Sequence, residues 1–462
     1  MKPFRHILPC LSWFVLFFLA GRANHLSANE IKTKLGPELG TELGLETVLS
    51  SLLTNNMQIK ESAQEIEIAK GQLEQAKAAL FPKASAMILA APIFEERGNA
   101  LESQSNWSKW GPFFKGTIEI AEPLYTFGQI SSYRRAAENN VTAQTELTQV
   151  KRNEVLLSAK EMFYGLQMAS GLEKLVHDLI SFLEEAVDTA DKNLKKKQST
   201  VKLHDVYKLK TALEDLRQKK LLAKAARQTA ERAVVWIAGM APQGAMGVRP
   251  LLPEPFELRN LDDYIKEAKL HRPEPRALTA GQAARSALKD AKRAQSFPVF
   301  FVGAFGSAGW SPVRDKQNSV FASDPFNRLE GGVGLGLKFD LEFKRHAAEA
   351  AQEEAQWMKL KATEGYALPG IELQVKKAYW EFEQAKEGLE VAQRRKEIAK
   401  KWFVSSAMGW SIGITPAKDL LEALEGDGLA KKNYIETVYA LNLSLGKLSQ
   451  AVGKEITHLK YR

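Results

Sequence analysis

The chain has 462 residues, of which 45% are hydrophobic and 26% charged, and its formal net charge at pH 7 is +9. Beyond the N-terminus no stretch stays apolar for the roughly 20 residues that a membrane helix needs, so any insertion of the mature chain into a membrane would use strands. The basic residues alternate with glutamate, as on solvated helix faces, and nucleic-acid binding is not expected.

Residues 1–28 are predicted to be a secretory signal peptide, because basic residues precede an apolar run and small residues at Ala23 and Ala28 offer cleavage points. Its removal takes away three basic residues and lowers the formal charge from +9 to +6. The only cysteine, Cys10, lies in this segment, so the mature chain has none. Export without disulfides indicates a Gram-negative envelope rather than a disulfide-stapled secreted domain. Residues 29–46 are predicted to form an extended leader.

The remainder of the chain shows one order of elements twice. Each repeat predicts a helix, two strands, a long helix and a returning helix, and the Phe-Pro pairs that begin at Phe81 and Phe297 lie 216 positions apart. Such self-similarity indicates two tandem units that bury their faces against each other. The predicted boundaries are residues 47–241 for repeat 1, 242–259 for a linker, 260–455 for repeat 2 and 456–462 for a C-terminal tail.

The predicted helices are long. The stretch from Gly128 to Gln198 has about 70 residues and would span roughly 105 Å, whereas residues 47–81 and 204–239 are each about half as long. Two half-length helices stacked end to end would therefore match one full-length helix. From Leu172 to Leu194, leucine, valine and alanine recur at steps of four and three, which predicts a coiled-coil seam within a long helical cylinder.

The second repeat predicts a long helix with the same kind of residue pattern, from Phe343 to about Met408. Pro369 and Gly370 interrupt its pattern, and a proline inside a helix removes a hydrogen bond and clashes with the preceding turn. We therefore expect a kink or a short insert partway along this helix.

Each repeat also predicts two strands, beginning with Ala84–Phe94. Phe114–Ala121 alternates between apolar and mostly polar residues, and residues 333–341 do so more clearly. The loops between strands, 96–111 and 311–329, are polar with aromatic flanks, which fits an interfacial girdle. A half-buried sheet in a soluble protein would show the same alternation of apolar and polar residues. Strands of about 10 residues, however, are long enough to span a membrane, which favours a membrane barrel. Four strands cannot close a barrel, and the smallest membrane barrels have eight, so an oligomer of at least two chains is required.

The sequence shows no catalytic constellation. It contains no HExxH, CxxC or GxSxG motif, and its histidines are separated from one another along the chain. Gly332–Gly336 resembles a nucleotide-binding loop only superficially, since no strand-turn-helix unit with a ribose-binding acid follows. Its glycines are better explained as the narrow inward face of a barrel strand. We therefore expect no enzymatic activity, cofactor or metal.

Two transitions carry a resemblance to a known family. Ala69–Leu89, with its Leu80-Phe81-Pro82, resembles the helix-to-strand transition of the TolC-like outer membrane efflux proteins, and Glu122–Gly128 resembles their strand-to-helix transition. The resemblance covers nearly the whole mature chain, because the same order of motifs occurs in both repeats. Further matches are Arg272-Pro273-Glu274-Pro275, Asp205-Val206, Asp419-Leu420, Ile237-Ala238-Gly239 and Ala451-Val452-Gly453.

The resemblance implies both a fold and a function. The fold is a homotrimer in which each chain adds four strands to an outer-membrane β-barrel, and coiled-coil hairpins form an antiparallel α-helical barrel through the periplasm. The function is a passive exit duct for drugs, metals or polypeptides, which docks through its periplasmic tip to an adaptor protein and an inner-membrane pump. The alternative is a periplasmic coiled-coil scaffold without channel activity.

The resemblance also places two groups of residues. Ser199 stands where the family has a glycine at the tip, and Asp340 or its neighbour stands where the second strand-to-helix transition has a proline. The aspartates at the tip either cap the returning helices or ring the pore. Candidates for the periplasmic tip and aperture are Ser199, Asp205, Gly413 and Asp419, and candidates for the barrel-helix junctions are Pro82, Pro123, Pro298 and Asp340.

Overall fold

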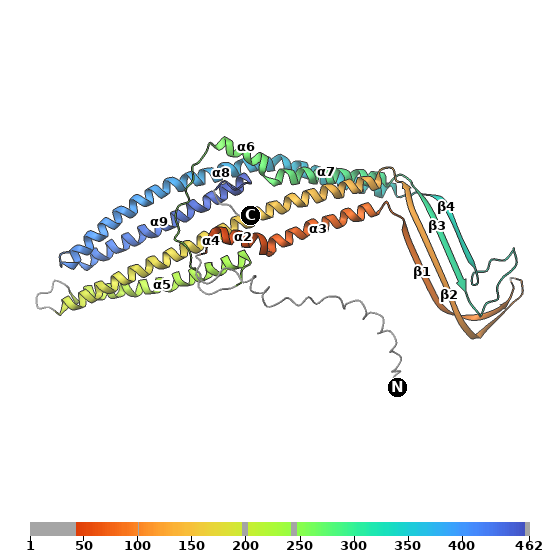
Figure 1. The fold of residues 1–462 in the computed structure, drawn as a ribbon, viewed down its shortest axis with the longest axis horizontal. Coiled ribbons are helices and arrows are strands. Elements are labelled where there is room, and N and C mark those ends of the chain that lie inside the picture. Colours follow the sequence, from red (N-terminus) through yellow and green to blue (C-terminus); the bar gives the residue numbers. More distant parts are fainter. Residues whose placement is uncertain (1–42, 100, 196–201, 242–246, 458–462) are drawn as a thin grey trace, which may run out of the picture.

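The computed structural model describes residues 43–99, 101–195, 202–241 and 247–457. The predicted signal peptide and most of the predicted leader lie outside these ranges. Within them the chain forms an elongated bundle of helices with a four-stranded sheet at one end (Figure 1). Among the helices described, none has the length and apolarity needed to cross a membrane.

The first predicted helix is in fact two helices, α2 (Leu45–Asn55) and α3 (Met57–Ala78). The break lies at Asn56, whose side-chain oxygen accepts hydrogen bonds from the backbone N–H groups of Gln58 and Ile59 at 2.9 and 3.1 Å. Its side-chain nitrogen donates to the carbonyl of Ile237 at 2.7 Å. Asparagine is a favourable N-cap, and this one is buried, so a tertiary contact interrupts a stretch that reads as one helix.

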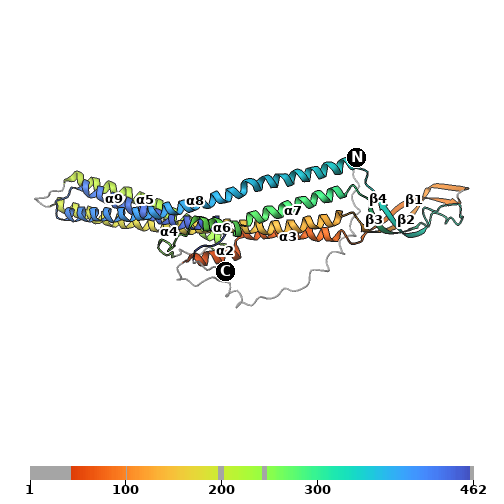
Figure 2. The same ribbon diagram turned by 90° about the horizontal axis from the view of Figure 1, so that it is seen from above.

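Two full-length helices run along the bundle, each flanked by two shorter ones (Figure 2). α4 packs against α3 over one half and α5 over the other, and α8 packs in the same way against α7 and α9. α4 also contacts α7 and α9, so it joins the two repeats. The predicted end-to-end stacking is therefore confirmed. The bounds are α4 (Gln129–Leu194), α5 (Leu203–Ala238), α6 (Leu261–His271), α7 (Pro273–Ala294), α8 (Phe343–Ser411) and α9 (Ala417–Val452).

Small residues form the seams between these helices. In α4 the predicted stripe buries Leu183, Ala186 and Ala190, which confirms the coiled-coil spacing. Alanine lets helix axes approach closely, and α7 uses it at every buried position after its first residue, Pro273. The buried alanines of α7 are Ala277, Ala280, Ala284, Ala287, Ala291 and Ala294.

α8 is continuous across Pro369. The predicted insert is therefore wrong. Pro369 is exposed, so its ring and the carbonyl left without an N–H partner meet solvent rather than a neighbouring helix. Burial resumes two residues later at Ile371, and the helix continues to Ser411.

The sheet is an antiparallel meander in the order β1-β2-β3-β4. Its strands are β1 (Lys83–Gly98), β2 (Ser103–Tyr125), β3 (Val299–Trp310) and β4 (Leu329–Lys338). β2 pairs with β3, so the central pairing joins the two repeats. These elements confirm the predicted mixed α and β fold with two repeats.

The strands of repeat 1 are longer than predicted. Residues 103–106, 110 and 111, expected to be a loop, pair with the outer part of β1. Trp110 lies opposite Phe94, and residues 107–109 form a bulge at this point of the register. The Trp107 ring stacks on the Phe94 ring with centroids 4.1 Å apart. Because Ser103–Ser108 is mostly polar and does not alternate, its strand conformation depends on this cross-strand aromatic contact.

The linker runs extended along α9. Asn442 donates to the carbonyl of Leu252 at 2.8 Å and accepts from the backbone N–H of Glu254 at 3.0 Å. Burial raises the pKa of the Glu254 carboxyl above its usual value. Nearby, the Lys160 ammonium of α4 is buried and pairs with Glu455 at 2.5 Å, which ties the end of repeat 2 to repeat 1.

Candidate functional site

The register of the sheet gathers apolar side chains on one side, here called the apolar face. Ile88 lies opposite Gly116, Ile118 opposite Gly306, and Val302 opposite Leu335, so alternate positions of all four strands point the same way. Leu335 and Ile88 are 82% and 85% exposed. A continuous exposed patch of this kind marks a surface that meets lipid or protein. The large members of the apolar face are Ile88, Phe114, Ile118, Ile120, Trp310, Val333, Leu335 and Leu337.

The opposite side, here called the polar face, carries Lys115, Thr117 and Glu119 of β2 and Glu330 and Lys338 of β4. The alternation predicted from the sequence is thus confirmed. On β1 and β3 the same side also carries apolar side chains, among them Met87 and Phe305, so most of its polar residues come from β2 and β4. A sheet with one mainly apolar face and most of its polar side chains on the other has the arrangement of a membrane barrel wall.

Two glycines of β4, Gly332 and Gly336, lie on the polar face under aromatic rings of β3. A Cβ added at Gly336 would lie 2.3 Å from the Phe301 ring, and one added at Gly332 would lie 3.0 Å from the Phe305 ring. Glycine is therefore required at Gly336 for the rings of β3 to lie flat across β4. This packing accounts for the glycine run without a bound nucleotide.

The segment between β3 and β4 crosses the outer end of the polar face. Val313 occupies the space that a Cβ at Gly111 would need. The guanidinium of Arg314 lies between the rings of Phe94 and Phe326, 4.7 and 4.4 Å from their centroids, and pairs with Glu96. These contacts fasten the segment to the β1-β2 hairpin through a buried cation between two aromatic faces.

At the junction of sheet and helices, Pro82 directly precedes β1 and Pro298 directly precedes β3. Pro123 instead lies inside β2, where the pairing with β3 shifts register before Tyr125. The chain turns into α4 only at Phe127 and Gly128, with φ angles of 49° and 86°. Pro123 thus lies at the end of the strand, two residues before β2 ends, rather than at the turn itself. A proline is tolerated here because a register shift needs one hydrogen bond fewer.

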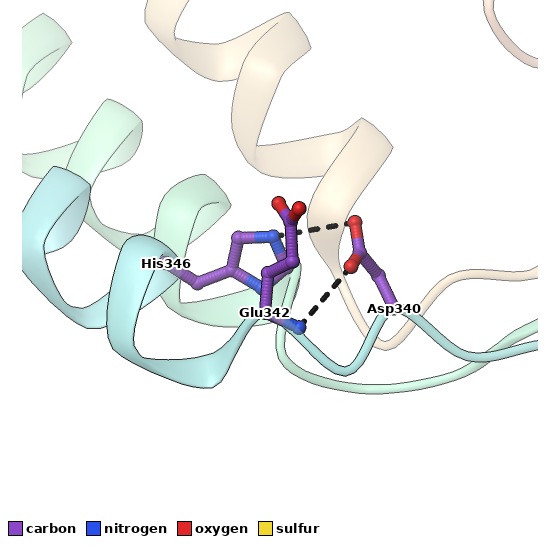
Figure 3. Close-up of side chains that lie close together, drawn as sticks. All are labelled: Asp340, Glu342 and His346. Atoms are coloured by element: carbon purple, nitrogen blue, oxygen red, sulfur yellow. Dashed lines mark hydrogen bonds and ion pairs between the residues drawn. The ribbon is translucent and has the colours of Figure 1, made fainter.

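Asp340 lies between β4 and α8, where it meets two other side chains (Figure 3). Its carboxylate accepts from the backbone N–H of Glu342 at 3.2 Å and faces Nε2 of His346 at 3.5 Å. His346 is only 2% exposed. Sequence reasoning missed this group because it compared histidines only with one another. The signal was present as two acids and a histidine within seven residues at a helix start.

At the other end of the bundle, the two helical hairpins share one core. Leu183 of α4, Leu209 of α5 and Leu420 of α9 are fully buried in it, together with Trp410 near the end of α8. α8 ends in a left-handed turn at Gly413, which has a φ of 76°. The backbone N–H of Ile414 then reaches back to the carbonyl of Gly409 at 2.8 Å. Ser199 lies outside the described residues.

The two candidate aspartates of the tip differ. Asp205 accepts a hydrogen bond from the backbone N–H of Lys202 at 3.3 Å and so helps to cap α5. Asp419 cannot make the equivalent bond, because the residue three positions before it is Pro416, which has no N–H. Asp419 is also exposed. Its carboxylate is therefore open to solvent.

The family described as Outer membrane efflux protein matches residues 48–240 and, a second time, residues 264–454. Protein CyaE of Bordetella pertussis is 24% identical over 243 residues, which make up 52% of this chain and 50% of CyaE. The match therefore spans about half the length of that curated relative.

Solved structures have the same arrangement of elements. The CmeC outer membrane channel of Campylobacter jejuni superposes with a TM-score of 0.72 at 14% identity, over 96% of this chain and 95% of CmeC. The MtrE outer membrane channel of Neisseria gonorrhoeae superposes with a TM-score of 0.70 at 15% identity, over 89% of each chain. At these identities the likeness shows a shared fold. Because the family matches both repeats in full, the chain belongs to the outer membrane efflux protein family.

Proposed function

We propose that this protein is the outer-membrane exit duct of a tripartite efflux or type I secretion system. It conducts substrates passively across the periplasm and the outer membrane and performs no chemistry. The observation that carries this proposal is the sheet with one exposed apolar face and one polar face, attached to helices about 100 Å long. Lipid would cover the apolar face, and the polar face would line an aqueous lumen.

The sheet also calls for several copies of the chain. β1 and β4 are its edge strands, and four strands are too few to close a barrel. Members of this family form trimeric channels in tripartite systems. Three copies would supply twelve strands and pair each β4 edge with the β1 edge of the next copy, which would leave no free edge.

The second candidate function is a periplasmic scaffold without a channel. It would leave side chains such as Leu335, Val333 and Ile88 in water, each more than three-quarters exposed. Soluble proteins rarely expose a contiguous patch of that kind. Recordings from planar bilayers separate the two functions, since a duct gives single-channel conductance steps and a scaffold gives none.

The same recordings test the tip. We expect Asp419→Ser to reduce the preference of the channel for cations, because an exposed carboxylate that is not needed as a cap would line the aperture. Asp205→Asn is the matched control and should leave selectivity unchanged, since the asparagine side-chain oxygen can occupy the place of the Asp205 oxygen and still accept the hydrogen bond of the Lys202 N–H. The measurement is the reversal potential in a salt gradient. Equal reversal potentials for Asp419→Ser and the unaltered protein would exclude Asp419 from the pore.

We further propose that the tip docks to a periplasmic adaptor, which links the duct to an inner-membrane pump. Single cysteines can test this, because the mature chain has none of its own. A cysteine at Ser411, at the end of α8, should crosslink to the adaptor in cells. One at Asn106, in the outer part of β2, should react with a membrane-impermeant reagent added outside. Labelling of Ser411 but not Asn106 from outside would invert the proposed topology.

Substrate choice belongs to the pump rather than to the duct. Both a drug or metal efflux role and a polypeptide secretion role fit a water-filled lumen lined by polar residues. Deletion of the gene, followed by comparison of toxin susceptibility and of the secreted proteins, would distinguish them. Increased susceptibility with an unchanged set of secreted proteins would support efflux, and the reverse would support secretion.

A further inference from the structure

Three metal-ligating side chains converge at the turn between β4 and α8. One oxygen each of Asp340 and Glu342 and one ring nitrogen of His346 all lie within 4.8 Å of one another. Figure 3 shows the imidazole at the first turn of α8, with Asp340 on the loop before it. The histidine is 2% exposed, whereas both carboxylates remain open to solvent, so a cation could enter from that side.

The imidazole of His346 is poorly satisfied by the protein alone. Its Nε2 faces the Asp340 carboxylate at 3.5 Å, which is longer than an ordinary hydrogen bond. Its Nδ1 is buried and has no hydrogen-bond partner. Buried polar atoms normally have partners, and an unpaired one needs an explanation. A cation placed between Nε2 and the carboxylates would take the Nε2 lone pair and give this nitrogen the close partner that Asp340 does not supply, while Nδ1 would keep the ring proton.

We propose that Asp340, Glu342 and His346 bind a divalent transition-metal cation, with Zn²⁺ as the fitting example. One imidazole and two carboxylates suit zinc, which takes nitrogen and oxygen ligands and completes a tetrahedron with water. Calcium and magnesium prefer oxygen ligands alone. The bound ion would join the end of β4 to the first turn of α8. The proposal does not depend on channel activity.

Arg345 is the competing cation of this site. Its guanidinium pairs with Glu342 and also lies 3.9 Å from Asp340 and 3.6 Å from Glu349. A bound metal would take over the first two carboxylates, and Arg345 would keep Glu349. Removing the guanidinium therefore removes a competitor, and Arg345→Gln should bind the metal more tightly than the unaltered protein.

The test is equilibrium dialysis of the purified full-length mature protein against zinc chloride, with bound zinc measured by mass spectrometry. The protein should carry a purification tag without histidine. We expect one zinc per chain, binding at least about tenfold weaker in Asp340→Asn and His346→Gln, and tighter binding in Arg345→Gln. His177→Gln is the matched control, because His177 is an exposed histidine of α4 outside this group, and it should bind like the unaltered protein.

Two results would overturn the proposal. The first is equal zinc binding by the unaltered protein and by the double variant Asp340→Asn, His346→Gln. The second is an unaltered protein that binds no zinc while His346→Gln lowers its thermal midpoint, which would show an ion pair only. Circular dichroism of each variant confirms that it is folded, so that lost binding reports on the ligands.

Discussion

Replacing Leu335 by arginine is expected to cost roughly 2–4 kcal/mol of folding free energy in a bilayer and to reduce assembly in the outer membrane. Leu335 lies near the middle of β4, is 82% exposed, and has Val302 as its neighbour on the apolar face. If that face meets lipid, a guanidinium there leaves water for hydrocarbon. Heat-modifiable migration of the protein from an outer-membrane fraction measures assembly.

Lys338→Gln is the matched control on the same strand. Lys338 lies on the polar face, so loss of its charge exchanges one polar side chain for another and should leave assembly intact. A protein that assembles equally well with either substitution would contradict the assignment of the two faces.

Replacing Leu420 by alanine should destabilise the helical bundle by about 2–5 kcal/mol, because it leaves a cavity in a well-packed core. Leu420 is fully buried where α4, α5, α8 and α9 meet. Guanidinium unfolding of the detergent-solubilised protein measures the change. Since this core holds the two hairpins together at the tip, the variant should also show larger or more frequent conductance steps.

Leu429→Ala serves as the control for that change. Leu429 is on the same helix but is 48% exposed, so its truncation removes fewer contacts and should cost less than about 1 kcal/mol. Similar guanidinium midpoints of unfolding for the two variants would show that the shared core does not stabilise the tip. Unchanged conductance with a lowered midpoint would separate stability of the bundle from closure of the aperture.

The sequence by itself determined the features that repeat or alternate. The two repeats follow from the same order of elements occurring twice along the chain. The long helices with half-length partners and the strands with one apolar side follow from hydrophobic periods near 3.5 and 2, which depend only on backbone geometry. The stripe through Leu183 and the alternation around Leu335 illustrate both periods. The family resemblance rested on local signals too, chiefly the motifs within Ala69–Leu89 and Glu122–Gly128 and the repeated order of the shorter matches.

Tertiary structure alone decided the features that depend on contacts between distant residues. Asn56 ends a helix because its side chain reaches Ile237, and the polar start of β2 is a strand because Trp107 stacks on Phe94. The group around His346 exists because a turn folds Asp340 back onto the first turn of α8. No period in the sequence encodes such contacts, since each is one pairing among many that local geometry allows.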